Sequence, residues 1–488
     1  MKYLLYFAAF SLFLVFIGCG NKPPAIEQPN GPSVVLPSVS DTFSAIATDP
    51  DGDNVKYRFD WGDGTISEWS DLFPSGTVHK TTYAYSSQNY YNIKCQAKDE
   101  KGKSSDWSIP FHVICGLGFI KWQLLADDDF DCECNSTPAI DDQGNIYIGC
   151  VSGHIHSLKS NGQERWRFNS ASFDEFISSP AIAANGNIYA CDRGGTIYAL
   201  TSDGALIWSH LTGSEILATP AIGRNNEIYV ASTDGYLYAY SSQGQEMWQR
   251  EIGSIGGRSS VAIDGDNHLF FGDDDGYFYS YDTVGNLRWR YEIGWEIYSS
   301  PAIMPNNKIC FGAQDGYFYI LNPDSTLFHR ENLVYNLSSS PVIGSDSAIY
   351  ITSEDGHLFR LSLNGDLDWV YPTQGYSGSS PAIVRNSFYN GDMIYFKVSW
   401  GKEKQDEDSL FMIKSDGTRF AASTIPQAMS AEFVSSPMVG QDGTVYIGGG
   451  INYDTDEGGF FALTGRGTVI NNNWPLFRHD TKNTGRTQ

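Results

Sequence analysis

The chain has 488 residues, of which 41% are hydrophobic and 14% are aromatic. This content excludes a disordered chain, and 18% charged residues are too few for a coiled coil. Fifty-seven acidic against 32 basic residues give a formal net charge of -25, which makes nucleic acid and anionic lipid headgroups poor partners. Cations, basic proteins and neutral glycans match this charge better.

The N-terminal segment has the features of an export signal. Residues 1–18 contain one lysine and an apolar run that is too short to cross a bilayer as a helix. Phe16-Ile17-Gly18-Cys19 resembles the lipobox of bacterial lipoproteins. The resemblance implies a lipid on Cys19 and, because Gly20 is not aspartate, sorting to the outer membrane. The alternative is a secreted protein in which Cys19 merely lies near the cleavage site.

Export would place the other seven cysteines in an oxidising compartment, where disulfides can form. They are Cys95, Cys115, Cys132, Cys134, Cys150, Cys191 and Cys310. Because seven is odd, at least one must stay unpaired. Cys132-Glu-Cys134 is too closely spaced for a zinc half-site and has no matching second pair. We predict structural roles for all seven.

A polar, proline-containing tether over residues 19–37 leads to a first folded module over residues 38–116. Short alternating strands broken by turn residues predict a small β-sandwich in this module. Asp60-Trp61-Gly62-Asp63-Gly64, with the strand VKYRFDW before it and AKDEKGKSSDWS after it, resembles PKD-type, immunoglobulin-like domains. In that family these domains are non-catalytic spacers or adhesion modules for protein or carbohydrate.

Three alternating aspartates in this module are candidate metal ligands. Asp49, Asp51 and Asp53 offer hard oxygen atoms to calcium. Gly52 falls at the fourth position of the loop, whereas an EF-hand loop requires glycine at the sixth. Asp and Gly are also favoured in a tight turn between strands, so a turn is the preferred interpretation and calcium is the alternative.

Internal repetition dominates residues 117–470. A landmark of a small residue, proline and apolar residues, SSPAI or a variant, recurs about every forty residues. Its eight copies lie at Pro138, Pro180, Pro220, Val261, Pro301, Pro341, Pro381 and Pro437. Each unit contains four short strands with alternating aromatics, and the Asp-Gly pairs between its second and third strands suit tight hairpin turns. We therefore predict an all-β chain, with the sandwich followed by an eight-bladed, four-stranded β-propeller.

The fourth strand of most units carries a tryptophan. These residues are Trp166, Trp208, Trp248, Trp289 and Trp369, with Phe328 and Phe420 in the equivalent places of two units. The last unit lacks a fourth strand, and Trp122, before the first unit, supplies the missing aromatic. We predict that the strand around Trp122 completes the last blade and leaves no exposed edge strand.

The recurrent Gly-x-x-x-Trp, as in Gly162 to Trp166, resembles the repeat of PQQ-like propellers. The resemblance implies that glycine serves a turn and that each of these tryptophans, Trp122 included, wedges between neighbouring blades. The tail, residues 471–488, contains WPLFRHD and Asn483-Thr484-Gly485 and resembles a terminal motif of exported members of this superfamily. Its implied role is packing.

A binding surface is expected where the blade-to-blade connectors and the turns between second and third strands meet on one face. Five residues before the landmark, five of eight connectors carry a glutamate: Glu133, Glu175, Glu215, Glu296 and Glu432. These carboxylates would form a negative ring able to hold a cation or a basic partner. The alternative is that each caps backbone amides or pairs locally.

Aromatic residues add to this face. The connectors carry Phe173, Phe176, Trp295 and Tyr335, and two enlarged acidic turns carry Trp400 and Tyr453. Exposed aromatics often mark binding patches, although loop insertions also drift without function. His154 and His156 share a strand face and could bind metal, but they align with tyrosines of other units, which favours a core or hairpin role.

These features favour a non-enzymatic, lipid-anchored envelope scaffold that binds protein or glycan on one propeller face and contacts the membrane only through its lipid. The eight-bladed lipoproteins of the outer-membrane β-barrel assembly machinery resemble the propeller but lack a sandwich module, so an assembly role is an alternative. PQQ- and calcium-dependent dehydrogenases are the enzymatic alternative. Their adjacent cysteines and large inserted loops are missing from the sequence, so PQQ is not expected, and no residue is assigned a catalytic role.

Overall fold

The computed structural model describes residues 21–32, 34–35, 37–87, 89–116, 120–125, 134–253, 258–386, 391–399, 409–424, 435–452, 457–465, 468–469, 476, 479–480 and 483–485. The chain divides into two compact units, Met1–Gly116 and Leu117–Gln488. The regular elements in the described residues are all β-strands, which confirms the predicted class. In this part of the chain, no helix has the length and apolarity needed to cross a bilayer.

The N-terminal unit is a small sandwich. Its strands are β1 Ala25–Ile26, β2 Val34–Val35, β3 Asp41–Ala45, β4 Ala47–Thr48, β5 Val55–Asp60, β6 His79–Tyr83, β7 Asn89–Asp99 and β8 Phe111–Cys115. The main sheet has the order β2-β8-β7-β5, and β1 pairs with β4 and β3 with β6. The prediction of a tether over residues 19–37 is therefore wrong for β1 and β2, which belong to the sandwich because their backbones pair with its strands. Along β5, buried and half-buried side chains alternate, as expected of a strand with one face in the core.

Trp61 lies in the core of this sandwich. Its ring stacks on Phe59 and on Tyr83, with centroid distances of 5.0 and 4.2 Å. The hydroxyl of Tyr85 donates a hydrogen bond of 2.9 Å to the backbone oxygen of Trp61. Immediately after the tryptophan the chain turns, with Gly62 at a φ of 78°, a conformation that glycine adopts without strain. The Asp-Trp-Gly segment thus places an aromatic in the core directly before a turn.

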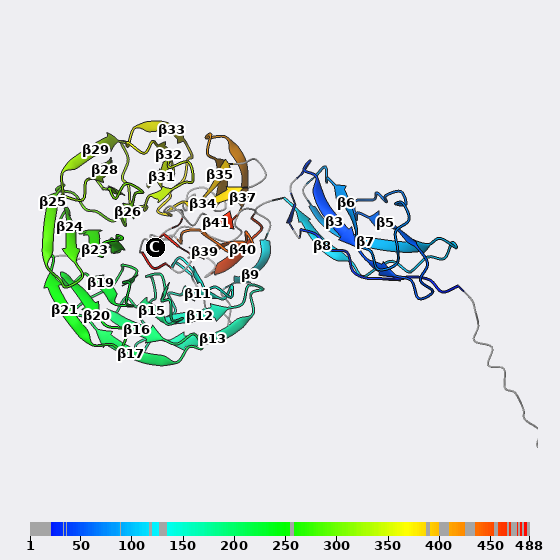
Figure 1. Ribbon diagram of the computed structural model, residues 1–488. Coiled ribbons are helices and arrows are strands. Elements are labelled where there is room, and N and C mark those ends of the chain that lie inside the picture. Colours follow the sequence, from blue (N-terminus) through cyan, green and yellow to red (C-terminus); the bar gives the residue numbers. More distant parts are fainter. Residues whose placement is uncertain are drawn as a thin grey trace, which may run out of the picture. The chain divides into compact units, whose positions relative to one another are not determined.

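The C-terminal unit consists of eight sheets in the described residues, which fits the predicted number of blades. Blades 1 to 4 are β10 Ala139–Ile140, β11 Ile146–Gly149, β12 His154–Leu158, β13 Glu164–Asn169; β14 Ala181–Ile182, β15 Ile188–Cys191, β16 Thr196–Leu200, β17 Leu206–Leu211; β18 Ala221–Ile222, β19 Ile228–Ser232, β20 Tyr236–Tyr240, β21 Glu246–Glu251; and β22 Ala262–Ile263, β23 His268–Gly272, β24 Tyr277–Asp282, β25 Leu287–Glu292. Within each blade, consecutive strands pair antiparallel, and the blades stand around a common axis (Figure 1).

The remaining blades follow the same order. Blades 5 to 8 are β26 Ala302–Ile303, β27 Ile309–Gly312, β28 Tyr317–Leu321, β29 Leu327–Asn332; β30 Val342–Ile343, β31 Ile349–Thr352, β32 Leu358–Leu361, β33 Leu367–Tyr371; β34 Ala382–Asn386, β35 Gly391–Val398, β36 Ser409–Lys414, β37 Arg419–Thr424; and β38 Met438–Val439, β39 Val445–Asn452, β40 Glu457–Leu463. A short strand, β41 Thr468–Val469, adds to β34 as the fifth strand of blade 7.

Blade 8 is completed from the start of the unit. Strand β9, Ile120–Leu125, pairs antiparallel with β40, and Trp122 lies opposite Ala462. The sheet order β38-β39-β40-β9 confirms the predicted closure. Because the outer edge of β40 is covered, the ring is closed by hydrogen bonds between the first and last strands of the propeller.

The predicted tryptophans each reach the next blade. The indole nitrogens donate hydrogen bonds of 2.8 to 3.2 Å to backbone oxygens: Trp122 to Ser160, Trp166 to Ser202, Trp208 to Ser242, Trp248 to Thr283, Trp289 to Pro323 and Trp369 to Ser415. Gly162, at a φ of 87°, lies against the ring of Trp122, and a Cβ there would lie 2.8 Å from the indole. The repeated glycine therefore makes room for the tryptophan of the preceding blade.

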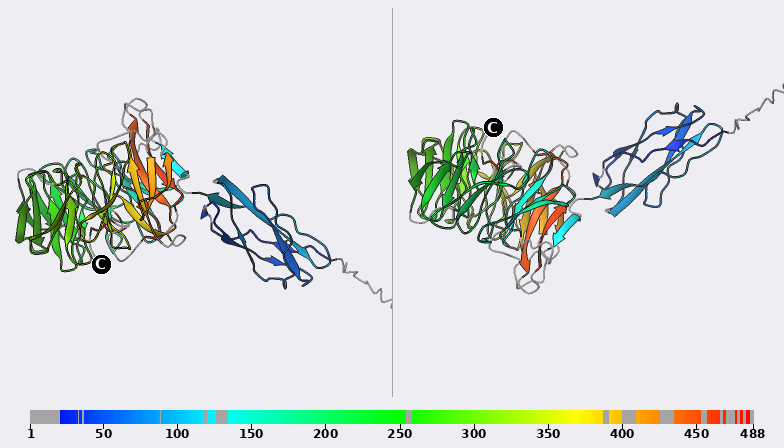
Figure 2. Two further views of the ribbon diagram at one scale, coloured as in Figure 1. Left: turned by 90° about the horizontal axis from the view of Figure 1, so that it is seen from above. Right: turned by 90° about the horizontal axis from the view of Figure 1, so that it is seen from below.

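The last described residues lie inside the ring, on its axis in Figure 1. Asn483 is fully buried, and its Nδ2 donates to the backbone oxygens of Pro138 and Pro180 at 3.3 and 3.1 Å. The backbone oxygens of Thr484 and Gly485 accept hydrogen bonds from Ile222 and Ile263 at 3.1 and 2.8 Å. The tail thus bonds to the first strands of four blades. Figure 2 shows the propeller from two further sides, with its ring of blades seen edge-on.

The described cysteines are all buried. Cys95, Cys115, Cys191 and Cys310 carry free thiols. The sulfur atoms of Cys134 and Cys150 lie 3.4 Å apart, on either side of the first hairpin of blade 1. Burial raises the pKa of the Cys95 thiol to about 11, which keeps it protonated and unreactive at neutral pH. Cys132 lies outside the described residues.

Candidate functional site

In seven of the eight units, two hydroxyl residues precede the landmark and fix the inner strand of the blade, whereas the third unit has Ala218 at the first position. The first bonds within its own blade: the Oγ of Ser136 accepts from the amide of Gly149 at 2.8 Å, and the Oγ of Ser339 from Thr352 at 3.0 Å. The second bonds to the neighbouring blade, since its oxygen accepts the amide hydrogen of the equivalent residue there. The pair of serines in SSPAI therefore holds one bond inside a blade and one between blades.

The second hydroxyls form a closed cycle around the axis, which we call the hydroxyl ring. Its members are Thr137, Ser179, Thr219, Ser260, Ser300, Ser340, Ser380 and Ser436, each accepting from its neighbour at 2.9 to 3.3 Å. All eight residues are at most 5% exposed. In the sequence these positions form part of the landmark, and their closure into a ring is visible only in the structure. The recurrent hydroxyl before the proline was the available signal.

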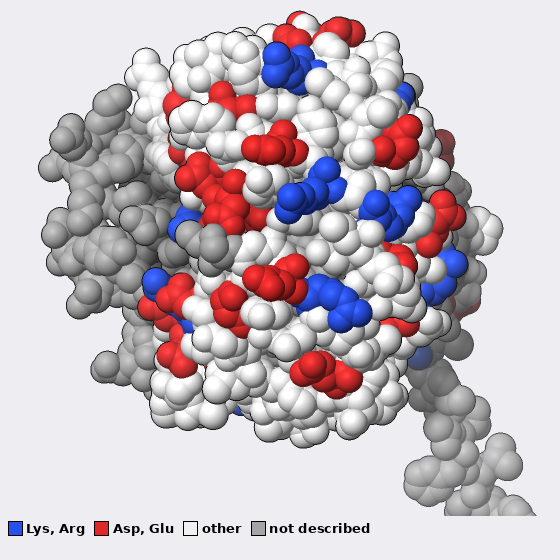
Figure 3. Space-filling view, turned by 90° about the vertical axis from the view of Figure 1, so that its left-hand side faces the viewer, with Lys and Arg blue, Asp and Glu red and all other residues white. Residues whose placement is uncertain are grey.

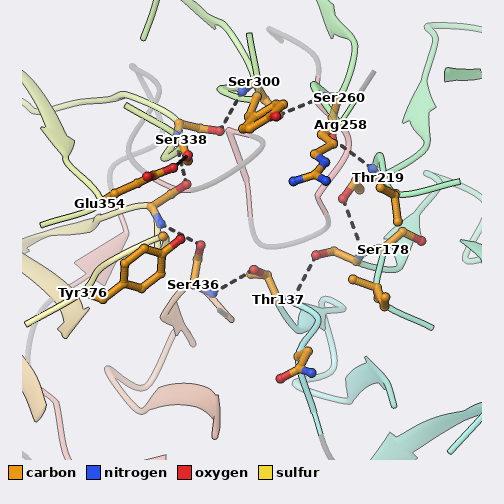
Figure 4. Close-up of a pocket in the computed structure, with 18 residues that line it drawn as sticks. Thr137, Ser178, Thr219, Arg258, Ser260, Ser300, Ser338, Glu354, Tyr376 and Ser436 are labelled. Atoms are coloured by element: carbon orange, nitrogen blue, oxygen red, sulfur yellow. Dashed lines mark hydrogen bonds between the residues drawn. The ribbon is translucent and has the colours of Figure 1, made fainter. Parts of the chain in front are cut away.

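The hydroxyl ring lines a cavity of about 210 Å³, here called the cup. Figure 4 shows Arg258 pointing into it from one side, with Glu354 on the other. The Arg258 guanidinium lies over the ring of Tyr298, 4.6 Å from its centroid. Glu354 accepts hydrogen bonds from Ser338, from Gln314 at 3.4 Å and from Asn336 at 3.4 Å.

One further wall residue stands out because it lacks a partner. Asn135 lines the cup and is 9% exposed, and its Oδ1 has no hydrogen-bond partner in the structure. A buried acceptor without a donor costs about 1–3 kcal/mol, so such groups commonly mark a bound water or ligand. Next to the cup, burial raises the pKa of Asp274 to about 6, and the positive charge of Arg258 opposes this increase.

The described connector glutamates are tied to the neighbouring turns by their backbone. The oxygens of Glu175, Glu215 and Glu296 accept hydrogen bonds of 2.7 to 3.0 Å from the amides of Arg193, Thr233 and Gln314. Asn336 accepts the same bond from Glu354, so the position does not require a glutamate side chain. These bonds place the connectors and the turns between second and third strands on one face, the connector face.

Two of these carboxylates also pair locally. Arg193 lies 3.0 Å from Glu175 and 3.3 Å from Glu215, with side chains about 40% exposed on both sides of each pair. Exposed pairs of this kind contribute only about 0–1 kcal/mol. Arg193 nevertheless offsets one of the two negative charges, which agrees with the alternative of local pairing at these two positions.

The predicted aromatics divide into two groups. Phe173, Trp295 and Tyr335 are 64%, 58% and 40% exposed on the connector face. Phe176, in contrast, is fully buried and packs on Tyr198 with a centroid distance of 5.7 Å, which corrects its expected place on the binding face. It fills the space between a connector and the next blade. Cys19, Glu133, Trp400, Glu432 and Tyr453 lie outside the described residues.

Comparison with known proteins places this architecture in a family. The family model described as outer membrane protein assembly factor BamB matches residues 151–371 and 234–463, more than half of the chain. The chain belongs to the BamB family. A PKD domain model matches residues 27–108, in agreement with the sandwich that precedes this BamB-family propeller. No curated protein sequence gives a significant match.

Solved structures share the fold at low identity. BamB from Moraxella catarrhalis is 16% identical with a TM-score of 0.57, covering 72% of this chain and 98% of its own. A europium-containing methanol dehydrogenase is 11% identical with a TM-score of 0.56, covering 70% and 85%. The C-terminal WD40 domain of Sif2 is 13% identical with a TM-score of 0.55, covering 72% and 99%. Identities this low establish a common fold and nothing about a shared ligand.

The residues of the cup do not fit pyrroloquinoline quinone. The quinone carries three carboxylates, whereas Arg258 is the one basic residue among the described lining residues. The cup is also smaller than the roughly 300–1,000 Å³ of typical cofactor pockets. The described lining therefore does not provide a site for this cofactor.

The N-terminal unit holds a cluster of carboxylates that differs from the predicted one. Oxygen atoms of Asp49, Asp53 and Asp99 lie within 4.8 Å of one another. Asp51 is not a member, because its Oδ2 accepts a hydrogen bond of 2.6 Å from the amide of Lys22. Asp49 is 4% exposed, and its Oδ2 has no hydrogen-bond partner, nor has the Oδ2 of Asp53. Oxygen-rich, partly unsatisfied groups of this kind suit calcium.

The two histidines of blade 1 occupy the core and the hairpin. His156 is fully buried, and its Nδ1 lies 2.7 Å from the Oε1 of Glu164. His154 faces Phe173 edge to face, with a centroid distance of 6.2 Å. A buried ring paired with a carboxylate and a ring packed on an aromatic agree with the preferred structural role.

Proposed function

We propose that this protein is a non-enzymatic envelope scaffold that binds a protein partner on the connector face of its propeller. The observation that carries the proposal is the group of exposed aromatics there, Phe173, Trp295 and Tyr335. Large aromatics provide much of the binding energy in protein interfaces and are costly to leave in water. The propeller supplies a rigid base for such a surface.

The backbone at Phe173, and at Val334 next to Tyr335, supports the proposal. Phe173 has a φ of 57° and Val334 a φ of 75°, the left-handed region that β-branched and bulky residues rarely adopt. Val334 is 74% exposed, so no packing in the described residues explains its presence there. Strained, exposed apolar residues are a signature of functional loops. The side of the propeller seen in Figure 3, in contrast, carries interspersed basic and acidic groups.

Site-specific photocrosslinking in intact cells tests the proposal. A photoreactive residue at Trp295 or Phe173 is expected to give a discrete adduct with a protein. The control is Val284, which is 64% exposed on the turn between the third and fourth strands of blade 4, at the opposite face. Equal adducts at Val284, or none at the connector face, would contradict the proposal. An adduct with an outer-membrane assembly protein would select the assembly role suggested by the family description.

The anchoring proposed here rests on the sequence of residues 1–20. Cys19 carries the lipid, which holds the folded units at the outer membrane. Metabolic labelling with a radioactive fatty acid is expected to mark the protein and to be lost in Cys19→Ser. Labelling that persists in that variant would exclude this anchor.

A second proposal concerns calcium. The orphaned oxygens of Asp49 and Asp53, together with Asp99, form the binding site, and the ion rigidifies the turn that joins β4 to β5. Lys101 lies 2.8 Å from the Oδ1 of Asp53 and offsets part of the negative charge, so weak binding is expected.

A further inference from the structure

The hydroxyl ring presents hydrogen-bond donors to the cup. Each ring oxygen already accepts an amide hydrogen from the neighbouring blade. No hydroxyl of the ring donates to another group in the described residues, and each therefore keeps its own hydrogen for a ligand. The cup floor thus offers a ring of donors that are at most 5% exposed.

The cup is closed below by the chain itself. The side-chain nitrogen of Asn483 bonds to the backbone oxygens of Thr137, Pro138 and Pro180, just beyond the ring. Thr484 and Gly485 continue across the inner strands of blades 3 and 4. A ligand therefore enters from the connector face and rests on the ring, and its size is limited by the cavity of about 210 Å³.

The walls supply one cation, Arg258, one carboxylate, Glu354, and one unsatisfied acceptor on Asn135. Arg258 forms no ion pair among the described residues, and its guanidinium lies over Tyr298, while its charge also acts on Asp274 beside the cup. Asn135 Oδ1 is a buried acceptor that still needs a donor. Glu354 is a poorer contact, because both its oxygens already accept hydrogen bonds from Ser338, Gln314 or Asn336.

We propose that the cup binds a small polyhydroxylated carboxylic acid, of the class of a hexuronic acid. Arg258 pairs with the carboxylate, the hydroxyl ring donates to the oxygen atoms of the ligand, and Asn135 Oδ1 accepts one of its hydroxyl hydrogens. The excess of donors disfavours an amino acid, whose ammonium group needs several acceptors. Tyr298, beneath the guanidinium, offers an apolar face to the sugar ring. This site is independent of the protein partner proposed above.

Calorimetric titration of the purified protein tests the proposal with D-glucuronate, D-glucose and L-glutamate. Glucose keeps the sugar ring but replaces the carboxylate by a hydroxymethyl group, and glutamate keeps a carboxylate but adds an ammonium. D-glucuronate is expected to bind saturably with one site per chain and at least about tenfold more tightly than the other two. Equal binding of glucose, preferred binding of glutamate, or no binding of glucuronate would overturn the proposal.

A matched pair of variants locates the site. Arg258→Gln is expected to weaken glucuronate binding about tenfold or more. Arg290 provides the control, since its guanidinium lies over Tyr277 at 4.9 Å on the outer strand β25, in the same arrangement but away from the cup. Arg290→Gln is expected to leave the affinity unchanged. Both substitutions affect part-exposed side chains, and equal melting temperatures would verify folding. An equal loss of glucuronate affinity in both variants would rule out the cup as the binding site.

Discussion

The indole nitrogen of Trp122 donates a hydrogen bond of 2.8 Å to the backbone oxygen of Ser160, and so joins the closing strand of blade 8 to blade 1. Strand β9 is therefore held by β40 on one side and by the first blade on the other. Trp166 makes the same bond to Ser202, but its blade is continuous in sequence. The two residues form a natural comparison between a closing contact and an ordinary contact between blades.

Replacing Trp122 should weaken the ring more than replacing Trp166. Trp122→Ala is expected to lower the free energy of unfolding by on the order of 3 kcal/mol, because it removes packing and also loosens β9 from the ring. Trp166→Ala removes a similar contact without opening the ring. Chemical denaturation of both variants measures the difference. Equal losses would show that closure adds nothing to the contact itself.

The stability of the propeller should depend on each member of the hydroxyl ring. In Ser300→Ala, the amide of Ser260 loses its acceptor at 3.0 Å in a fully buried place. An orphaned buried amide costs about 1–3 kcal/mol, and this is the expected loss in the free energy of unfolding. Ser202→Ala, on an exposed turn, serves as the control and is expected to change stability by less than about 0.5 kcal/mol. If Ser300→Ala leaves the free energy of unfolding unchanged, water replaces the hydroxyl as the acceptor.

His156 should make the propeller less stable in mild acid. Burial lowers the pKa of His156 from its ordinary value of 6.5, so the folded chain resists protonation that the unfolded chain accepts. Stability is therefore fully present above about pH 6.5 and falls as the pH drops toward the folded pKa, by at most about 1.4 kcal/mol per unit.

The variant His156→Tyr, which places the residue of the equivalent Tyr198 position in blade 1, is expected to flatten this dependence. Melting temperatures between pH 7.5 and 4.5 measure it, with His329→Gln in blade 5 as a control. An unchanged slope in His156→Tyr would assign the acid sensitivity to other groups.

Calcium should stabilise the N-terminal unit through Asp99 and without Asp51. Binding at a hundredfold excess over the dissociation constant adds about 2.7 kcal/mol to the free energy of unfolding. Asp99→Asn is expected to abolish the calcium-dependent rise in melting temperature, and Asp51→Asn to keep it. If Asp51→Asn instead abolishes the calcium-dependent rise in melting temperature, the ligands are the three aspartates expected from the sequence, Asp49, Asp51 and Asp53. If calcium does not raise the melting temperature of the unaltered protein, these aspartates serve only to form the turn.

The fold was predictable because its determinants are local and repeated. The alternating aromatics and the missing fourth strand of the last unit were sufficient to predict the pairing of β9 with β40. Trp122 supplies the eighth copy of the aromatic residue that the fourth strands of the other units carry. Such periodicity is independent of any single contact, so one weak copy does not change the conclusion.

The site was less predictable because it depends on contacts between blades. The glutamate pattern is visible in the sequence, but Arg193, which pairs with Glu175 and Glu215, follows no repeat. Phe176 and Trp295 both lie in connectors, and only packing decides that one is buried and the other exposed. The position of Asp99 beside Asp49 likewise follows from the pairing of β5 with β7, which spacing in the sequence does not reveal.

Closure by β9 also has a consequence for the order in which the protein can fold. Strand β9 is among the first parts of the propeller to be synthesised, yet its partner β40 appears only near the end, and Asn483 later still. Until then both edges of the growing array are open to other chains, and a long loop must be closed before their pairing contributes to stability. The native ring is therefore a product of the complete chain, and truncation near the C-terminus removes the partner of its first strand.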